Sequence, residues 1–286
     1  MITGTGIWSG ELRFGDPAEM AEAAAELESW GYTALWIPDV GGDLFGALDR
    51  LLGATTSVTI ATGVLNIWHQ TPGATAAWWS AQPPAVRDRT MLGLGVSHGP
   101  LIGERWSRPL AAMREFLDAL DEADVPAPER VPADRRCLAA LGPKMLELAR
   151  DRAAGAHPYL VTPEHTARAR EALGPGALLA PELGVVLETD PDAARAVARQ
   201  AVAGYTSLPN YVNNWKRLGF TDDDVASLSD RLVDALVAWG DADAIAARVA
   251  EHRSAGADHV CLQALQAPGA GGGLSARATW KALAGI

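Results

Sequence analysis

The chain has 286 residues, of which 48% are hydrophobic and 21% charged, a composition typical of a globular protein with one large domain or two smaller ones. Its formal net charge of −11 argues against nucleic acid and anionic membrane surfaces as partners, because both require a basic face. The sequence lacks a basic N-terminal region followed by an apolar run, and it lacks any apolar run of about 18 residues. It therefore predicts no signal peptide, no membrane span and a cytoplasmic location.

Short apolar runs alternate with amphipathic segments through the first half of the chain, which predicts strands that are each followed by a helix. The expected strands of this half cover residues 4–8, 34–37, 58–67 and 91–96, and the expected helices cover residues 16–30, 44–54, 71–81 and 109–124. The strands are apolar instead of alternating with polar residues, as is typical of a parallel sheet covered on both faces.

The next apolar run, residues 137–141, predicts a strand that leads directly into a helix over residues 144–152. Gly142 ends the run, and Pro143 suits the first turn of a helix. Such a junction leaves free N–H groups and the positive end of the helix dipole, and Lys144 adds a charge, so the junction is a candidate phosphate site. The residues alone favour the simpler interpretation, an ordinary connection that binds nothing.

The second half continues the same alternation, with one longer interruption. The expected strands cover residues 157–161, 178–187 and 259–265, and the expected helices cover residues 163–173, 191–206, 241–255 and 276–284. Residues 207–240 predict an insertion with two helical pieces, and residues 268–273 a flexible glycine-rich segment. Cys137 and Cys261 lie in apolar runs, so we expect reduced thiols in the core.

Eight apolar strands, nearly all followed by helices, predict a (β/α)8 TIM barrel that forms a single domain over residues 1–286, with insertion segments. The alternative is a doubly wound open sheet. It lacks the support of a glycine-rich dinucleotide turn, because Gly93-Leu94-Gly95 lies inside a strand and has no third glycine.

The carboxyl ends of the strands are where a barrel carries its chemistry. The polar and aromatic residues at these ends are Trp8, Asp39, Asn66, Trp68, His69, Ser97, His98, Gly142, Lys144, Thr162 and Gln263. Capping of the next helix is an equally good interpretation of Asp39, and capping or packing of His69. His98 follows glycines that allow close approach of a ligand, and a structural role for it stays equally open.

The other four histidines give no sign of a site. His157 and His259 begin predicted strands at the opposite end of the barrel, so we expect structural roles for them. His165 and His252 fall on predicted helix surfaces, where we expect solvated side chains.

The sequence lacks the motifs of several common classes of enzyme. The sequence has no metal-ligand spacing, no Gly-x-Ser-x-Gly turn and no lysine at a strand end for a Schiff base. What remains is a tryptophan-lined mouth with a phosphate site and few acid or base groups. This combination suits a bound organic cofactor that carries the reaction.

Five segments in the right order resemble the bacterial luciferase-like flavin and deazaflavin oxidoreductases, and most closely the branch that uses coenzyme F420. These segments are residues 6–8, 34–39, 61–66, 92–98 and 140–145. The resemblance covers nearly the whole chain and implies a (β/α)8 barrel, usually a homodimer, with the cofactor ring in its mouth. The ten tryptophans also suit an aromatic interface.

The resemblance also implies roles for particular residues. A non-prolyl cis peptide at Gly63-Val64 would back the ring, and Asp39 matches the acid that binds the ring side in F420 enzymes. The loop near the cofactor phosphate corresponds to Ala140, Leu141, Gly142 and Pro143, with Lys144 as an added charge. Arg105 and Arg108 at the rim suit a polyglutamate tail.

Two departures from the family pattern bear on proton transfer. Val40 stands where many relatives place a histidine, and His98 stands where several relatives carry a glutamate. His98 is therefore the first candidate catalytic residue and His69 the second.

Three functions stay open at this point. The leading hypothesis is hydride transfer between F420 and a small organic substrate, the second is an FMN-dependent monooxygenase that uses oxygen, and the third is a non-catalytic cofactor-binding paralogue. An unrelated aldolase or isomerase is disfavoured, because the strand ends lack a lysine and paired acids.

Overall fold

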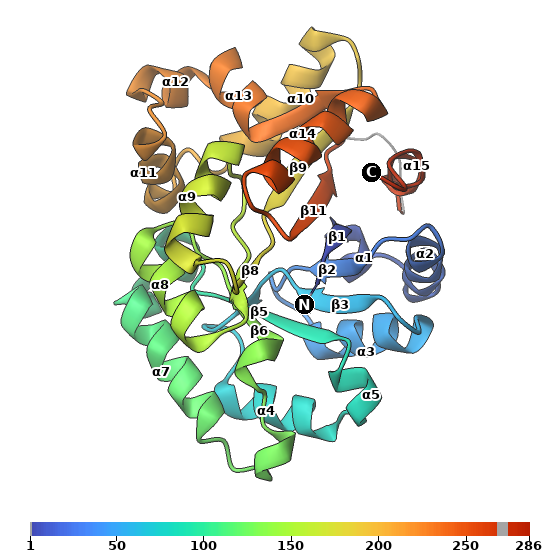
Figure 1. The fold of residues 1–286 in the computed structure, drawn as a ribbon, viewed down its shortest axis with the longest axis vertical. Helices are drawn as coiled ribbons and strands as arrows, with labels where there is room; N and C mark the ends of the chain where they lie inside the picture. Colours follow the sequence, from blue (N-terminus) through green and yellow to red (C-terminus); the bar gives the residue numbers. More distant parts are fainter. Residues whose placement is uncertain (1, 268–273) are drawn as a thin grey trace.

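The computed structural model describes residues 2–267 and 274–286, and in this part of the chain eleven strands form one curled, all-parallel sheet (Figure 1). The order in the sheet is β10-β9-β11-β1-β2-β3-β5-β6-β7-β8, with β4 beside β5. The strands are β1 (Gly4–Trp8), β2 (Ala34–Ile37), β3 (Thr59–Thr62), β4 (Leu65–Asn66), β5 (Thr90–Gly95), β6 (Arg136–Leu138), β7 (Gly155–Ala156), β8 (Leu178–Leu179), β9 (Glu182–Leu187), β10 (Val237–Gly240) and β11 (His259–Ala264).

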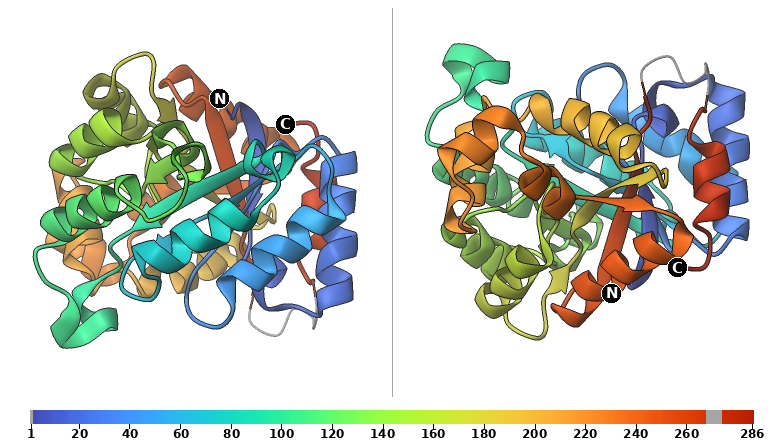
Figure 2. Two further views of the ribbon diagram at one scale, coloured as in Figure 1. Left: turned by 90° about the horizontal axis from the view of Figure 1, so that it is seen from below. Right: turned by 90° about the horizontal axis from the view of Figure 1, so that it is seen from above.

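Helices cover the outside of the curl (Figures 1 and 2). They are α1 (Glu11–Phe14), α2 (Pro17–Ser29), α3 (Leu44–Ala54), α4 (Pro72–Ala81), α5 (Pro84–Arg87), α6 (Gly99–Ile102), α7 (Pro109–Asp121), α8 (Pro143–Arg152), α9 (Pro163–Leu173), α10 (Pro191–Ala203), α11 (Pro209–Arg217), α12 (Asp222–Ser227), α13 (Asp230–Leu236), α14 (Ala242–Ser254) and α15 (Arg277–Ala282). Short 3-10 turns lie at Gly103–Arg105, Ala127–Glu129 and Ala133–Arg135.

The helices begin where the sequence provides a capping side chain. Asp16 accepts from the backbone N–H groups of Ala18 and Glu19 at the start of α2, and Thr162 accepts from His165 N at the start of α9. Each cap is followed by proline, which fits the first helical position because its missing N–H would have no partner there. These starts confirm the predicted helices.

The core around the sheet has two parts, because the strands are buried on both faces. Side chains such as Leu35 and Leu262 belong to the large cluster that includes the surrounding helices. A second cluster, made mainly of strand residues, fills the inside of the curl and contains Trp36, Cys137 and Cys261. Both cysteines are free and buried, as predicted.

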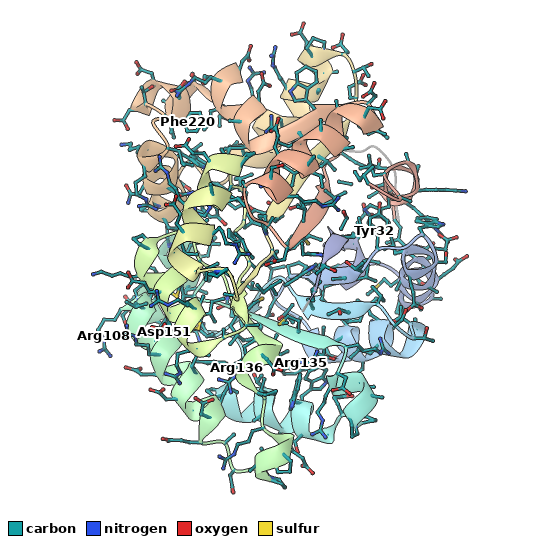
Figure 3. The ribbon with its side chains drawn as sticks, in the orientation of Figure 1. Tyr32, Arg108, Arg135, Arg136, Asp151 and Phe220 are labelled. Carbon is teal, nitrogen blue, oxygen red and sulfur yellow. The ribbon has the colours of Figure 1, made fainter. Side chains whose placement is uncertain are left out.

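Arg136 ties the start of β6 to the end of α7. Its side chain is 2% exposed, and Nη2 donates to Asp121 Oδ1 at 2.6 Å. Arg135, the preceding residue, instead reaches Asp88 across the surface. Figure 3 labels both arginines at this end of the molecule.

The predicted strand over residues 157–161 is wrong. The strand here is β7, and the chain leaves the sheet after it. Pro158 has no N–H to donate to a ladder, and Leu160 has φ +55°, a left-handed conformation that a strand does not contain.

The region from residue 178 to residue 187 forms two strands instead of the single one predicted. Pro181 separates β8 from β9, as proline interrupts a ladder. β8 pairs with β7, whereas β9 pairs with β11 and β10. The fold is therefore an α/β fold with a curled parallel sheet.

The insertion differs from its prediction in two ways. It contains α11, α12 and α13 in place of two helical pieces, and its end forms β10, which was not predicted. A separate apolar cluster holds these helices against α10, with Trp215 and Phe220 among its members (Figure 3). The insertion is thus a packed layer at one end of the molecule (Figure 1).

The C-terminal helix lies beside α2, near the start of the chain (Figures 1 and 2). The hydroxyl of Tyr32, labelled in Figure 3, donates to the carbonyl of Trp280 at 2.6 Å. The glycine-rich segment 268–273, predicted to be flexible, lies outside the described residues. Over residues 2–267 and 274–286, no helix combines the length and apolar character needed to cross a membrane.

The prediction that His165 and His252 are solvated is wrong, because both side chains face inward. His165 Nε2 lies 3.1 Å from the Leu141 carbonyl oxygen, and His252 Nδ1 lies 2.9 Å from Thr166 Oγ1. Burial lowers the pKa of His165 to about 4 and that of His252 to about 3. Both imidazoles are neutral parts of the packing between helices.

His157 and His259 are structural, as expected, although His157 follows β7 instead of beginning a strand. The His157 ring stacks on Trp36 with 4.3 Å between ring centroids, and Trp36 Nε1 donates to His259 Nε2 at 3.2 Å. Gly6 leaves the space for this histidine, since a Cβ there would lie 2.6 Å from His259 Nε2.

Candidate functional site

The carboxyl ends of the parallel strands meet at one edge of the curled sheet and bring the predicted residues together. Ile7 is opposite Leu262 in the register of β1 and β11, so Trp8 lies next to Gln263. Asn66 is opposite Gly95 in the register of β4 and β5. The mouth is therefore built from strands that are far apart in the sequence.

A non-prolyl cis peptide joins Gly63 and Val64 between β3 and β4, at the position that the family resemblance implied. Three hydrogen bonds hold the segment. Gly63 N donates to the Ile37 carbonyl at 2.8 Å, Trp8 Nε1 donates to the Gly63 carbonyl at 2.6 Å, and Asp39 N donates to the Val64 carbonyl at 3.3 Å. The peptide is thus held by residues at the ends of β1 and β2.

The glycines of β5 provide space for the Val64 side chain. A Cβ on Gly95 would lie 2.3 Å from Val64 Cγ2, and one on Gly93 would lie 2.0 Å from the Thr62 carbonyl oxygen. The Gly93-Leu94-Gly95 segment therefore serves close packing and not a dinucleotide turn. Val64 remains half-buried at the edge of the mouth.

Asp39 is buried directly after β2, and its two carboxylate oxygens differ in their surroundings. Oδ2 accepts from Asn66 N at 3.1 Å and from Gln70 Nε2 at 3.3 Å. Oδ1 is buried and has no hydrogen-bond donor within the described ranges; His69 Nδ1 lies 4.0 Å away. Since Asp43 caps α3, the capping interpretation of Asp39 is wrong, and one of its oxygens is free to accept from a ligand.

The two candidate catalytic histidines lie in different settings. His69 is exposed, with Nδ1 3.3 Å from Asn66 Nδ2. His98 is partly buried, and Nδ1 lies 3.1 Å from Asn210 Oδ1 at the start of α11. Because an amide oxygen only accepts, His98 Nδ1 carries the proton and Nε2 is left as an acceptor. Burial lowers the pKa of His98, which favours this neutral form.

Tryptophans and an arginine form the rim beside β5. Trp68 Nε1 and Trp106 Nε1 both donate to the Val96 carbonyl, at 2.7 and 2.9 Å. Arg105 Nη1 lies 3.4 Å from the Trp68 carbonyl, so it belongs to the rim. Arg108 instead points to the outside, near Glu115 (Figure 3).

The segment after β6 places the predicted phosphate loop at the N-terminus of α8. Gly142 is the N-cap, with no side chain capping the helix, and a Cβ on it would meet nothing within 4 Å. Pro143 and Lys144 are exposed, Leu141 is half-buried, and Ala140 is buried. Pro143 has no N–H, and the N–H groups of Met145 and Leu146 donate to the Gly142 carbonyl, so this turn leaves the Lys144 N–H for a ligand.

The sequence pattern described as luciferase-like monooxygenase matches residues 2–259. The chain belongs to this family. Members of the luciferase-like monooxygenase family are oxidoreductases, and the chain is an enzyme of this class. No curated protein has a significantly similar sequence.

Solved structures of F420 and FMN enzymes share the fold. The F420-dependent tetrahydromethanopterin reductase from Methanopyrus kandleri has a TM-score of 0.73 and 16% identity, with 99% of this chain and 97% of that chain covered. An F420-dependent secondary alcohol dehydrogenase with an F420-acetone adduct has a TM-score of 0.69 and 17% identity, with 92% and 94% covered.

The oxygenating constituent of 3,6-diketocamphane monooxygenase from Pseudomonas putida, in complex with FMN, has a TM-score of 0.67 and 13% identity, with 100% of this chain and 98% of that chain covered. Identities this low establish the fold alone. Cofactor and substrate are therefore argued from this luciferase-like chain's own residues.

The sequence reasoning missed a group of tyrosines in the mouth of this luciferase-like fold. Tyr159, Tyr205 and Tyr211 lie with ring centroids between 4.8 and 6.4 Å apart, and Tyr211 also faces His98 at 5.4 Å. A signal was present, because three of the four tyrosines lie between residues 159 and 211. Tyr159 was instead assigned to a strand and Tyr211 to the insertion.

Glu182 was missed as well. It is the first residue of β9, 1% exposed, and its Oε2 accepts from Leu160 N at 2.9 Å. Burial raises the pKa of Glu182 to about 8. An acid in the middle of an apolar run is an unusual residue choice, and this was the signal in the sequence.

Within the described residues, no three or more His, Cys, Asp or Glu side chains are arranged to hold a metal ion. The polar groups of the mouth are instead spaced singly among aromatic side chains. This spacing is typical of a site for an organic ligand.

Proposed function

We propose that this luciferase-like enzyme transfers a hydride between coenzyme F420 and a small organic substrate. The observation that carries the proposal is the buried Asp39, with one oxygen unpaired among the described residues, beside the Gly63-Val64 peptide. Leaving a buried carboxylate oxygen without a donor is costly, so a ligand N–H or O–H at this position would stabilise the site. The resemblance to F420 enzymes assigns that donor to the cofactor ring.

The residues present fit the cofactor at both of its ends. Val64 and Gly63 offer an apolar surface at the ring end. At the phosphate end, the segment Ala140, Leu141, Gly142, Pro143 and Lys144 offers the backbone N–H and the positive charge of Lys144. When bound, F420 supplies a ring carbon that gives or accepts a hydride.

His98 is proposed as the group that exchanges a proton with the substrate. Its Nε2 is an acceptor in the neutral form, and Asn210 fixes the ring from the other nitrogen. His69 is the second candidate. Val40, at the position where many relatives place a histidine, is 70% exposed, so this position offers no acid or base.

The alternative is an FMN-dependent monooxygenase. The luciferase-like monooxygenase description and the likeness to an FMN complex favour it, and the helix N-terminus of α8 suits the phosphate of either cofactor. A non-catalytic cofactor-binding paralogue would bind without turnover.

We also propose that the sheet closes as a (β/α)8 barrel, with β8 and β9 as one bent strand. Hydrogen bonds on both sides of this strand support it. Ala180 N donates to the Ala156 carbonyl at 2.9 Å toward β7, and Cys261 N donates to the Pro181 carbonyl at 2.9 Å toward β11. A homodimer remains a proposal from the resemblance, which sedimentation at micromolar concentration tests.

The cofactor is tested by titrating the purified protein with F420 and, separately, with FMN, followed by tryptophan fluorescence. Micromolar or tighter binding of F420 alone is expected. Asp39→Asn should weaken F420 binding about tenfold, because an N–H would then face the cofactor donor. Asp243→Asn, an exposed acid in the first turn of α14, is the matched control.

Preference for FMN would replace the leading proposal with the monooxygenase. Unchanged F420 affinity in Asp39→Asn would place the ring elsewhere. Tight binding of F420 without turnover in a screen of alcohols and ketones would favour the non-catalytic paralogue.

A further inference from the structure

A cavity of about 320 Å³ lies between β9, β11 and α10, one indole ring away from the Gly63-Val64 peptide. Trp8 separates the two. Its Nε1 donates to the Gly63 carbonyl at 2.6 Å, and its ring packs against Tyr159, with centroids 5.6 Å apart. The cavity therefore adjoins the proposed ring site but is lined by other residues.

The lining of the cavity combines apolar surface with uncharged polar groups. Leu160, Val197 and Leu265 provide apolar surface, and no lysine, arginine or histidine lies among the described lining residues. Without a cation, the cavity offers nothing to compensate the desolvation of a phosphate or carboxylate.

Two tyrosine hydroxyls in the wall are already committed as donors. Tyr205 donates to the Tyr159 hydroxyl at 3.2 Å, and Tyr159 donates to Gln263 Oε1 at 2.6 Å. This chain fixes the side-chain amide of Gln263 and leaves its N–H groups as donors.

Glu182 is the one acid among the described residues of the wall. Its Oε2 is held by Leu160 N, whose left-handed backbone turns the N–H toward the carboxyl group. Since burial raises the pKa of Glu182 to about 8, the group is a neutral acid at pH 7 and has an O–H to donate. The free donors among the described residues of the wall thus include this O–H and the side-chain amides of Gln263 and Gln200.

We propose that this cavity is a binding chamber, separate from the ring site, for a small, uncharged molecule with an apolar body and one acceptor oxygen, a ketone or an alcohol, bound by Glu182 and Gln263. The volume equals the share of roughly ten water molecules, which limits the ligand to a compact molecule.

The chamber is tested on the full-length protein without added cofactor by ligand-observed NMR titration with three probes of one shape: cyclohexanone, cyclohexanecarboxylate and cyclohexylamine. Cyclohexanone should bind at least about tenfold more tightly than either charged probe at pH 7. Ala201→Phe fills the cavity from α10 and should abolish binding, whereas Ala203→Phe, on the exposed end of α10, should not.

The pH dependence reports on Glu182 itself. In the wild-type protein, cyclohexanone affinity should fall as pH rises through about 8, because the carboxylate has no proton to donate. Glu182→Gln keeps an acceptor for Leu160 N and cannot ionise, so its affinity should stay constant from pH 7 to 9.

Tighter binding of cyclohexylamine or cyclohexanecarboxylate than of cyclohexanone would contradict the proposed chamber. Unchanged cyclohexanone affinity in Ala201→Phe would also contradict it. The same pH dependence of cyclohexanone affinity in the wild-type protein and in Glu182→Gln would mean that Glu182 does not bind the ligand. An F420 titration of the wild-type protein separates this proposal from the function above. F420 binding without any probe preference would mean that the chamber alone fails, whereas absence of F420 binding would mean that the cofactor assignment fails.

Discussion

Val64 and Gly95 show how single residues shape the mouth. The Val64 side chain lies where a Cβ on Gly95 would be, with 2.3 Å between that Cβ and Val64 Cγ2. Val64 lies between β3 and β4, next to β5, and a larger residue at position 95 would displace the valine. The sequence motif at residues 93–95 thus reports on the ring site without contacting a phosphate.

Gly95→Ala should therefore weaken F420 binding and destabilise the fold. The methyl group displaces Val64 toward the ring site, and overpacking of this kind costs about 1–3 kcal/mol. Gly53→Ala is the control, because Gly53 lies in α3 with nothing within 4 Å of its Cβ; it should stabilise the protein by about 0.5–1 kcal/mol. Urea unfolding and F420 titration measure both effects, and an unchanged F420 affinity in Gly95→Ala would separate Val64 from the cofactor.

The strand ends of the first half were largely predictable, although the single strand predicted over residues 58–67 is wrong, because these residues form β3 and β4. Asp39, Asn66 and His98 each follow an apolar run, and parallel strands bring such ends together. The tyrosines and Glu182 were not predictable in this way. Their positions depend on the departure of residues 157–161 from the sheet and on how the insertion folds back, and neither follows from local periodicity.

At the level of elements, substitutions at the junction between β6 and α8 can separate the effect of an N-cap on helix stability from the effect of its charge on phosphate binding. Gly142 caps α8 without a side chain, and the Lys144 N–H in the first turn has no acceptor within the described residues. Aspartate and asparagine are both good N-caps, but only aspartate brings a negative charge to the place of a phosphate.

Gly142→Asp should therefore stabilise the fold by a few tenths of a kcal/mol while weakening F420 and FMN binding about tenfold or more. Gly142→Asn is the matched control. It should stabilise the helix similarly and weaken binding less, because it adds no charge. Thermal unfolding and cofactor titration give the two readouts. Equal affinities in the aspartate and asparagine variants would mean that no phosphate binds at α8.

The predictions of elements failed where a strand was too short, or too bent, to produce a recognisable apolar pattern in the sequence. β7 has two residues, and the apolar residues that follow it belong to the packing of the insertion. β10 pairs in parallel with residues 184–187 of β9. Tertiary pairing decides such strands, so single-sequence patterns do not reveal them.

For the whole molecule, the four buried histidines reduce stability at low pH, and buried Glu182 reduces it as pH rises. Burial lowers the pKa of His157 and His165 to about 4 and that of His252 and His259 to about 3. Between these values and the unfolded value of 6.5, the unfolded chain binds more protons than the folded one. Stability is therefore greatest above pH 6.5 and is lost as pH falls, by up to about 1.4 kcal/mol per pH unit for each histidine.

Glu182 acts in the other direction. Its folded pKa of about 8 lies above the unfolded value of 4.5, so the folded protein binds the extra proton between these two values. Stability from this group is fully present below pH 4.5 and declines as pH rises toward 8. Four histidines outweigh one glutamate below pH 6.5, and above it only the glutamate acts among these five groups.

The free energy of unfolding should consequently be greatest near pH 6.5, with a steep decline in acid and a shallower one toward pH 8. Urea unfolding at pH 5, 6.5 and 8 measures the profile. Glu182→Gln should remove the decline above pH 6.5 and keep the acid one, because its amide does not titrate. His252→Gln should flatten the acid decline, whereas His69→Gln, at an exposed position, should leave it unchanged. An unchanged slope between pH 6.5 and 8 in Glu182→Gln would show that Glu182 is ionised in the folded protein, and the donor of the proposed chamber would then be absent.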